Sequence, residues 1–137
     1  MFCRILAGEL DGSFIYRGKN CSAFLDIHPI TPGHVLIVPN NHFERFIDIE
    51  PFAAREMMET AQKVLKAIGK TNLKCEGANI FLSDGEVAGQ EVPHSHLHIA
   101  PRFQGDKQRM GFSHADPDEV DRAELNEIAA KIYQELQ

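Results

Sequence analysis

Three histidines alternate with other residues in the stretch HSHLHIAPR, which runs from His94 to Arg102. In a β-strand, side chains two positions apart project from the same face, at about 6.6 Å from one to the next. The apolar residues after the histidines favour a strand, because a helix would spread the three rings around its axis. The sequence therefore predicts a strand that presents three imidazoles on one face: His94, His96 and His98.

An imidazole has an ordinary pKa of about 6.5, so near neutral pH it can serve as nucleophile, acid, base or metal ligand. One hypothesis is a nucleophilic histidine between two neighbours that hold anionic oxygens or a leaving group. A second is a zinc site that uses all three histidines as ligands. The nearest acids, Glu91 and Asp106, do not lie at a ligand spacing, which weakens the zinc hypothesis. A polar strand face without chemistry is the least favoured interpretation.

The rest of the chain predicts an α+β fold with a mainly antiparallel sheet, one long central helix and a C-terminal helix. Short β-leaning runs occupy residues 13–17, 21–27, 34–38 and 79–82. The third run, HVLIV, is apolar throughout, as expected of a strand that is buried on both faces. After Arg102 the chain is polar and irregular to about Pro117.

Apolar residues at three- and four-residue spacing indicate the two helices. The central helix can begin at Pro51 and end at Gly69. The C-terminal helix covers about residues 121–136, with Asp121 and Glu124 placed as a capping pair. Their expected buried residues are Met57, Met58, Ala61, Val64, Leu65 and Ile68 in the first, and Leu125, Ile128, Ala129, Ile132 and Leu136 in the second.

The chain has 137 residues and no repeat or linker divides it, so we expect one domain over residues 1–137. The net charge of −6 argues against nucleic acid as a partner, because phosphate neutralisation needs a basic surface. No apolar run approaches the ~18 residues of a membrane span, so we expect no membrane partner. Three cysteines without tight spacing fit a reduced, cytoplasmic protein better than a disulfide framework.

Three segments together resemble the histidine triad (HIT) family. HSHLHIA resembles the family pattern of three histidines that alternate with apolar residues. AFLDIHPITPGHVLIVP, residues 23–39, resembles its strand–loop–strand with an acid and a histidine, and SDGEVAGQEVPHSHLH, residues 83–98, resembles its glycine–glutamine loop before the triad. The resemblance covers about residues 2–104 and favours the nucleotide hydrolase branch of bacterial type. It implies a HIT-like α+β fold, a homodimer, a purine nucleotide substrate and no cofactor.

The resemblance assigns the reaction to four histidines. His96 would attack the α-phosphate of an activated nucleotide, and water would hydrolyse the nucleotidyl-histidine intermediate to release nucleoside monophosphate. His98 would hold a phosphate oxygen, His94 would order the triad and the leaving-group side, and His34 would fix imidazole orientation. Related transferases and phosphorylases carry glutamine where this chain has His98, which favours a hydrolase. Expected substrates are nucleoside phosphoramidates, aminoacyl-adenylates or dinucleoside polyphosphates.

The same resemblance implies a set of binding residues. Gly89 lets the backbone pass close to the ligand because glycine has no Cβ, and Gln90 would contact phosphate or the leaving group. Asp26 would accept hydrogen bonds from the ribose hydroxyls. Ser83 stands where several members have asparagine near the ribose and phosphate. The apolar lining around the base would be Phe2, Ile5, Phe24 and Ile27.

Departures from the family pattern keep other functions open. Ser83 and Ser95 replace residues that are usual in the family, so a nucleotide-binding or protein-interaction module with weak activity is an alternative. Some bacterial-type members bind structural zinc through a Cys-x-x-Cys pair and two histidines. Cys3 and His42 remain here, but the chain begins too late to supply the first cysteine, so we expect no metal site.

Overall fold

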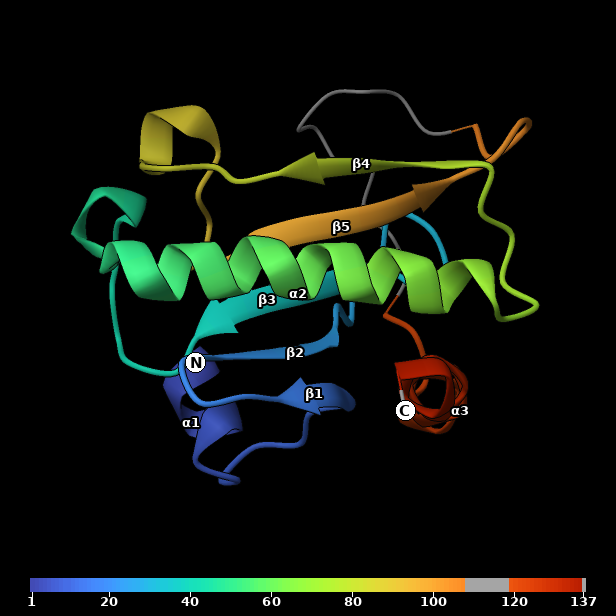
Figure 1. The fold of residues 1–137 in the computed structure, drawn as a ribbon, viewed down its shortest axis with the longest axis horizontal. Helices are drawn as coiled ribbons and strands as arrows, with labels where there is room; N and C mark the ends of the chain where they lie inside the picture. The colour runs from blue at the N-terminus through green and yellow to red at the C-terminus, as the bar shows by residue number, and fades with distance from the viewer. Residues whose placement is uncertain (108–118, 137) are drawn as a thin grey trace.

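The strands of the described residues pair antiparallel in one sheet, in the order β1-β2-β3-β5-β4 (Figure 1). The computed structural model describes residues 1–107 and 119–136. The strands are β1 (Phe14–Arg17), β2 (Cys21–Leu25), β3 (Val35–Pro39), β4 (Gly77–Phe81) and β5 (Leu97–Arg102). The helices are α1 (Phe2–Leu6), α2 (Pro51–Gly69) and α3 (Arg122–Leu136), with short 3-10 turns η1 (Phe46–Asp48) and η2 (Glu86–Ala88). The predicted α+β class and antiparallel sheet are confirmed.

Helix α2 runs across one face of the sheet and forms the main core with it (Figure 1). Pro51 stands in its first turn, where the missing N–H costs no hydrogen bond. Strand residues that alternate onto this face, among them Ile37 and Ile99, pack against the helix. Helix α3 packs against both α2 and β1 and extends the same core. The buried apolar residues of the two helices include Met57, Ala61, Val64, Ile68, Leu125, Ile128, Ala129 and Ile132.

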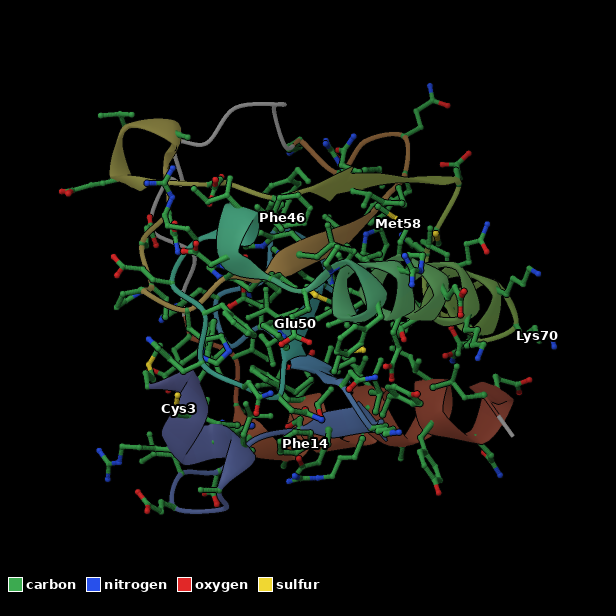
Figure 2. The ribbon with its side chains drawn as sticks, turned by 60° about the vertical axis from the view of Figure 1, so that its left-hand side comes forward. Cys3, Phe14, Phe46, Glu50, Met58 and Lys70 are labelled. Carbon is green, nitrogen blue, oxygen red and sulfur yellow. The ribbon has the colours of Figure 1, made fainter. Side chains whose placement is uncertain are left out.

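The predicted bounds of α2 are confirmed, but one of its expected core residues is wrong. Met58 is 53% exposed. Figure 2 shows it on the side of α2 that faces β4, the edge strand of the sheet. Its apolar position on the helix therefore points toward an edge that no other element of the described chain covers. In α3 the expected apolar side is confirmed, with Leu136 partly buried against the core.

Each predicted strand outside the triad is present, with ends that differ by one or two residues. Helix α1 is an addition that the sequence did not predict, because five residues are too few to show a helical period. Residues 108–117 of the stretch expected to be irregular lie outside the described residues. Among the helices of residues 1–107 and 119–136, none combines the length and the apolar character that crossing a membrane requires.

The opposite face of the sheet carries a second apolar cluster. Phe24, Leu36 and Val38 project to this side and pack against Phe2 of α1. Since α1 has only five residues, it covers part of the face, and a cavity remains beside it. The two faces therefore differ in role, because α2 and α3 seal the first and the second stays accessible to a ligand.

Candidate active site

The strand that carries the triad begins later than the sequence predicts. β5 starts at Leu97, so His98 lies in the strand while His94 and His96 lie in the irregular segment before it. The rings of His96 and His98 are neighbours, with centroids 4.7 Å apart. The His94 ring instead lies edge-on to the ring of His42, at 5.1 Å. The prediction of three imidazoles on one strand face is therefore wrong, because the segment departs from strand geometry before its first two histidines.

Strand pairing lines up one residue from each of four strands across the open face of the sheet. Phe24 pairs with Leu36, Leu36 with His98, and His98 with Phe81. Paired residues share a face, so the His98 ring lies between Leu36 and Phe81. The rings of His98 and Phe81 stack with centroids 4.3 Å apart and planes 8° from parallel. Phe81 therefore fixes the plane of the His98 imidazole.

His34 decides which nitrogen of His98 carries the proton. The backbone N–H of Ile30 donates to His34 Nδ1 at 3.0 Å, so the proton of His34 is on Nε2. His34 Nε2 lies 2.9 Å from His98 Nδ1, which must accept this hydrogen bond. Asp26 Oδ2, 3.7 Å from His34 Nε2, favours the same arrangement. His98 therefore carries its own proton on Nε2, as a hydrogen-bond donor.

His96 carries its proton on the other ring nitrogen. His96 Nδ1 lies 2.8 Å from the carbonyl oxygen of His94, which can only accept, so Nδ1 bears the proton and Nε2 the lone pair. His96 is 7% exposed, and this burial lowers its pKa, which favours the neutral ring. A buried neutral imidazole with a lone pair on Nε2 is the form that can attack an electrophilic centre.

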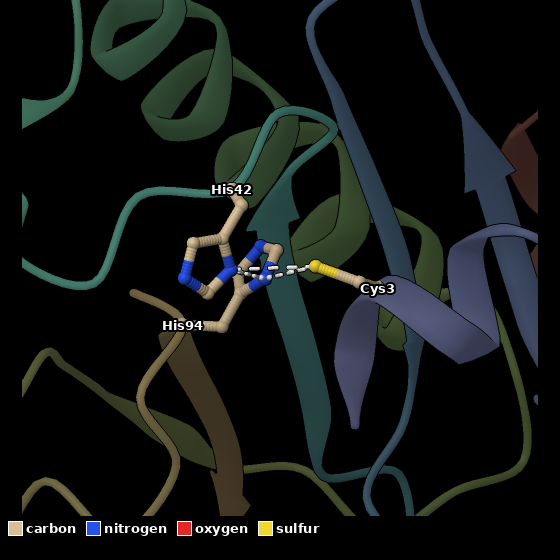
Figure 3. A group of neighbouring side chains, drawn as sticks. All are labelled: Cys3, His42 and His94. Atoms are coloured by element: carbon tan, nitrogen blue, oxygen red, sulfur yellow. Dashed lines mark hydrogen bonds between the residues drawn. The ribbon is translucent and has the colours of Figure 1, made fainter.

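The His94 side chain turns away from His96. Its Nε2 donates to the Pro39 carbonyl at 3.0 Å, which leaves the lone pair on Nδ1. That nitrogen lies 3.5 Å from Cys3 Sγ and 3.3 Å from His42 Nδ1 (Figure 3). Burial is the main cause that lowers the pKa of His94. The His94 side chain therefore joins α1 to the segments before α2 and β5.

The side chains of Cys3, His42 and His94 form a group that can hold a metal ion (Figure 3). Their donor atoms lie 3.3, 3.5 and 3.3 Å apart. With zinc–nitrogen bonds of about 2.0–2.1 Å and zinc–sulfur bonds of about 2.3 Å, two corners of a zinc tetrahedron stand about 3.3–3.6 Å apart. The three atoms fit three corners of such a site, whereas a structural zinc site has four protein ligands. A zinc ion here would fix the position of the His94 ring. The expected absence of a metal stays a prediction.

A cavity of about 840 Å³ lies on the open face of the sheet. His96 and His98 line it, together with Leu36 and Phe81, the two residues that pair with His98. Most of the predicted binding residues also line it: Phe2, Ile5, Phe24, Asp26, Ile27, Ser83 and Gly89. The structure thus gathers residues from the start, the middle and the triad segment of the chain around one hollow.

Gln90 is a predicted binding residue that does not line this cavity. Its side-chain amide donates to the carbonyls of Glu44 and Val92, at 2.6 and 2.9 Å. Its Oε1 accepts from the Gly85 N–H at 2.8 Å. Gln90 therefore holds three backbone segments together and positions the loop before the triad. His34 and His94 do not line the cavity either.

An ion pair and a glycine shape the loop that carries Ser83 and Gly89. Arg45 Nε donates to Asp84 Oδ1 at 3.0 Å, and the Phe46 N–H donates to the same oxygen at 2.7 Å. The hydrogen bonds from Arg45 lower the pKa of Asp84. Gly89 closes the η2 turn at φ 99°, a left-handed conformation that favours glycine. A larger residue at position 89 would strain the backbone next to the cavity.

Several residues of the site were not predicted from the sequence. Phe81 and Leu36 follow from strand register, which the sequence alone did not fix. The family resemblance links His42 only with Cys3, and nothing in the spacing indicates that the His94 side chain joins them. Arg122 lines the cavity from the first turn of α3, and no motif marked it.

Comparisons with known proteins agree with this geometry. A model of the HIT domain family matches residues 7–105. An uncharacterised HIT-like protein of Methanocaldococcus jannaschii is 36% identical over 132 residues, covering 96% of this chain and 97% of its own. The crystal structure of a zinc-bound histidine triad family protein from Mycobacterium smegmatis is similar, with a TM-score of 0.83 and 32% identity, over 98% of this chain and 91% of that one.

Two similar proteins are named by an activity. The asymmetrical bis(5'-nucleosyl)-tetraphosphatase of Schizosaccharomyces pombe is 36% identical over 112 residues, covering 80% of this chain and 61% of its own. An adenosine 5'-monophosphoramidase of Saccharomyces cerevisiae is 33% identical over 102 residues, covering 74% of this chain and 61% of its own.

Ser95 allows a test of the packing behind the triad. It is 1% exposed, and its hydroxyl has no hydrogen-bond partner among the described residues. We expect Ser95→Ala to leave the free energy of unfolding unchanged or to raise it by up to about 1 kcal/mol, because it removes an unsatisfied buried polar group. The matched control is Ser22→Ala, since the equally buried Ser22 donates to Asn40 Oδ1 at 2.7 Å. This control should lose about 1 kcal/mol in urea unfolding. Equal losses in both variants would contradict the assignment.

Proposed function

The chain belongs to the histidine triad (HIT) family, and on that premise we propose that it is a nucleotide hydrolase that works through a nucleotidyl-histidine intermediate. The observation that carries the proposal is the hydrogen bond from His96 Nδ1 to the His94 carbonyl. It leaves a lone pair on Nε2 of a buried neutral imidazole at the cavity. A volume of about 840 Å³ falls within the range of about 300–1,000 Å³ that is usual for small-molecule sites.

The nucleotide would lie across the four paired residues Phe24, Leu36, His98 and Phe81. We place its α-phosphate at His96 and His98, and its ribose at the carboxylate of Asp26. The base would then rest on apolar side chains at the β2 end of the cavity, which give affinity with little discrimination between bases. These side chains are Phe2, Ile5, Phe24 and Ile27.

In the first step, the lone pair on His96 Nε2 forms a bond to the α-phosphorus. The bond between phosphorus and the leaving group breaks, and its electron pair departs with the leaving group, which takes a proton from water. His96 Nδ1 keeps its proton and donates a hydrogen bond to the His94 carbonyl. This carbonyl therefore stabilises the positive charge that the ring gains. The N–H of His98 Nε2 donates to a non-bridging phosphate oxygen, where negative charge develops.

In the second step, water attacks the same phosphorus and the bond to Nε2 breaks. The electron pair returns to His96, and the proton lost by the attacking water neutralises the hydroxide left by the first step. The products are nucleoside monophosphate and the protonated leaving group. Two displacements replace one difficult attack of water on a charged phosphate ester or amide.

The substrate class follows from what the site recognises. Every contact proposed above falls on the nucleoside monophosphate half, so the leaving group can be an amine, an aminoacyl group or a second phosphorylated nucleoside. The two relatives named by activity act on a nucleoside phosphoramidate and on a dinucleoside tetraphosphate, which supports this class for the present chain. His98 in place of glutamine supports transfer to water over transfer to another acceptor.

The geometry counts against zinc chemistry on the three triad histidines. Among the described residues, His94 groups with Cys3 and His42, whereas His98 groups with Asp26 and His34. His96 belongs to neither group. Three ligands of one ion would have to converge on a single point, whereas the His94 side chain turns away from His96 and His98.

We also propose that the protein is a cytoplasmic homodimer. The cysteines of the chain are free, which suits a reducing compartment. β4 is an edge strand, and Ile80 pairs with the core residue Ile99, so its exposed side chain lies on the α2 face of the sheet. Phe46 and Met58 are exposed on the same side of the molecule (Figure 2). A second copy can pair with such an edge around a two-fold axis and cover the apolar patch.

Replacement of His96 tests the nucleophile. We expect His96→Ala to lower kcat/KM for a dinucleoside tetraphosphate or a nucleoside phosphoramidate by a factor on the order of 10³ or more, because no other group replaces the attacking nitrogen. Acid-quenched wild-type enzyme should show an added mass of one nucleoside monophosphate, and the variant should not. Ser95→Ala, next to the nucleophile, is the control and should keep its turnover. Full turnover by His96→Ala would refute the proposal.

The pH profile tests the protonation state of His96. Protonation of Nε2 removes the lone pair, so activity is present above the pKa of His96 and is lost as the pH falls through it. Because burial lowers that pKa, log kcat/KM should stay level through pH 7 and decline only below about 6.5. The measurement is initial rate against pH for a dinucleoside tetraphosphate. A decline that begins above pH 7 would show that the ring is protonated more easily than its burial allows.

The homodimer is tested by light scattering after gel filtration. The wild-type chain should elute with twice the mass of one chain, and Ile80→Lys combined with Met58→Lys should elute as a monomer, because two charges cannot be buried at the β4 edge. Tyr133→Lys is the matched control, since Tyr133 is equally exposed on α3. A monomeric wild type would disprove this contact.

A further inference from the structure

We propose that two residues at the rim of the cavity, Arg122 and Asp11, select a 6-oxopurine base such as guanine over adenine. The inference rests on the proposed function, because it assumes that the cavity holds a nucleotide with its phosphate at His96. Both residues line the same cavity as the triad. Neither belongs to the segments in which the triad motif or the phosphate contacts lie.

The position of Arg122 places it at the base end. Its Nη1 donates to Ser13 Oγ at 2.8 Å, and Ser13 precedes β1. The N–H of Val120, two residues earlier, donates to the carbonyl of Ile27 at 3.2 Å. Arg122 therefore lies at the β1–β2 side of the sheet, whereas His98 lies in β5, with β3 between them. At about 4.8 Å per strand, β2 and β5 stand about 10 Å apart, so Arg122 lies nearer to the base end of the cavity than to the strand that carries His98.

The Arg122 side chain is held in place by buried neighbours. Ser13 is 2% exposed, and its hydroxyl also donates to Asn126 Oδ1 at 2.7 Å. Asn126 lies one turn after Arg122 on α3, so both project from the same side of the helix. An arginine guanidinium has five N–H donors, and the bond to Ser13 fixes its position while using only one of them. The helix thus presents an oriented, donor-only group to the cavity.

Asp11 reaches the cavity from the loop between α1 and β1. Leu10 and Gly12, its neighbours, line the cavity as well. A Cβ at Gly12 would stand 2.7 Å from Ile5 Cγ2 and 2.9 Å from the Phe14 ring, so the loop lies directly on these side chains. Glycine is therefore needed for the loop to pass so close to Ile5 and Phe14. This contact holds Asp11 next to the apolar side chains around the base. A carboxylate there is an acceptor-only group.

A donor-only and an acceptor-only group match the edges of guanine. Guanine offers two adjacent acceptors, O6 and N7, and arginine commonly binds them with two hydrogen bonds. Its N1–H and 2-amino group are donors that a carboxylate can accept. Adenine carries an amino donor at position 6, next to N7, which opposes the guanidinium, and it has no 2-amino group. The apolar side chains around the base bind either purine, so Arg122 and Asp11 decide between guanine and adenine.

The test compares guanosine, inosine and adenosine 5'-monophosphates by calorimetric binding, and phosphoramidates of the same nucleosides by turnover. We expect wild-type protein to bind GMP and IMP at least about fivefold more tightly than AMP, the lower end of what one bidentate arginine contact contributes in base recognition. Arg122→Met should abolish that preference. Arg122→Lys, which keeps the charge but loses the planar pair of donors, should also reduce it. Asp11→Ala should remove any preference for GMP over IMP, because it takes away the carboxylate that accepts from the 2-amino group, which only guanine has.

Control variants separate recognition of the base from a general change in the charge of the protein. Lys131→Met removes a charge elsewhere on α3, and Glu9→Gln removes one that pairs with exposed Arg4, so both should keep the base preference. Equal binding of the three nucleotides by wild type, or an equal loss for all three in Arg122→Met, would overturn the inference. Base-dependent binding without any turnover would instead leave the inference intact and refute the hydrolase proposal. A thermal melt of each variant identifies any that fail to fold, and Arg122→Lys then carries the test.

Discussion

The antiparallel pairing of β5 with β3 decides where the whole site lies. It sets His98 opposite Leu36 and Ile99 opposite Val35. A slip of one residue would exchange the two faces, burying the imidazole under α2 and exposing Ile99. His34 stands one residue before β3 and alternates with Val35, so it projects to the open face and meets His98 at 2.9 Å. The register that builds the hydrophobic core therefore also builds the hydrogen bond between these two histidines.

Backbone groups, more than side chains, assign the protons in this site. The Ile30 N–H determines which nitrogens of His34 and His98 carry protons, and the His94 carbonyl does the same for the nucleophile His96. Neither depends on the side chain of the residue that supplies it. Both depend on the path of a loop. In the loop that carries Ile30, the Thr31 hydroxyl donates to the Pro101 carbonyl, and before the triad the amide of Gln90 holds the carbonyls of Glu44 and Val92. A glutamine outside the cavity can thus matter to the chemistry because it holds the loop that leads to the triad.

The sequence predicted the parts of this protein that repeat a local period. The helix from Pro51 to Gly69 and the buried strand before Asn40 follow from spacing alone, and the family resemblance located the histidines and the apolar lining. Met58 was wrong because a helical period shows which residues share a side, but not where a sheet ends. The direction of the His94 ring could not be predicted, since it depends on Pro39 and Cys3, which are distant in sequence. Arg122 and Phe81 were missed for the same reason, because only tertiary packing and strand register bring them to the cavity.

The placement of acidic groups explains how a chain with a net charge of −6 can hold a phosphate and still keep a neutral nucleophile. A carboxylate in contact with His96 would favour the imidazolium form and remove the lone pair that attacks. The one beside the histidines, Asp26, lies 3.7 Å from His34, whose Nδ1 is already engaged by a backbone N–H. A carboxylate oxygen of Asp26 also lies within 4.8 Å of a ring nitrogen of His98, so its charge acts on His34 and His98 rather than on His96. Burial is the largest influence on the pKa of His96 and lowers it, while the hydrogen bond to the His94 carbonyl and the charge of Glu91 oppose this shift. The site presents neutral donors to the anion, and the low pKa that this requires follows from the apolar packing of Phe2 and the sheet around the nucleophile.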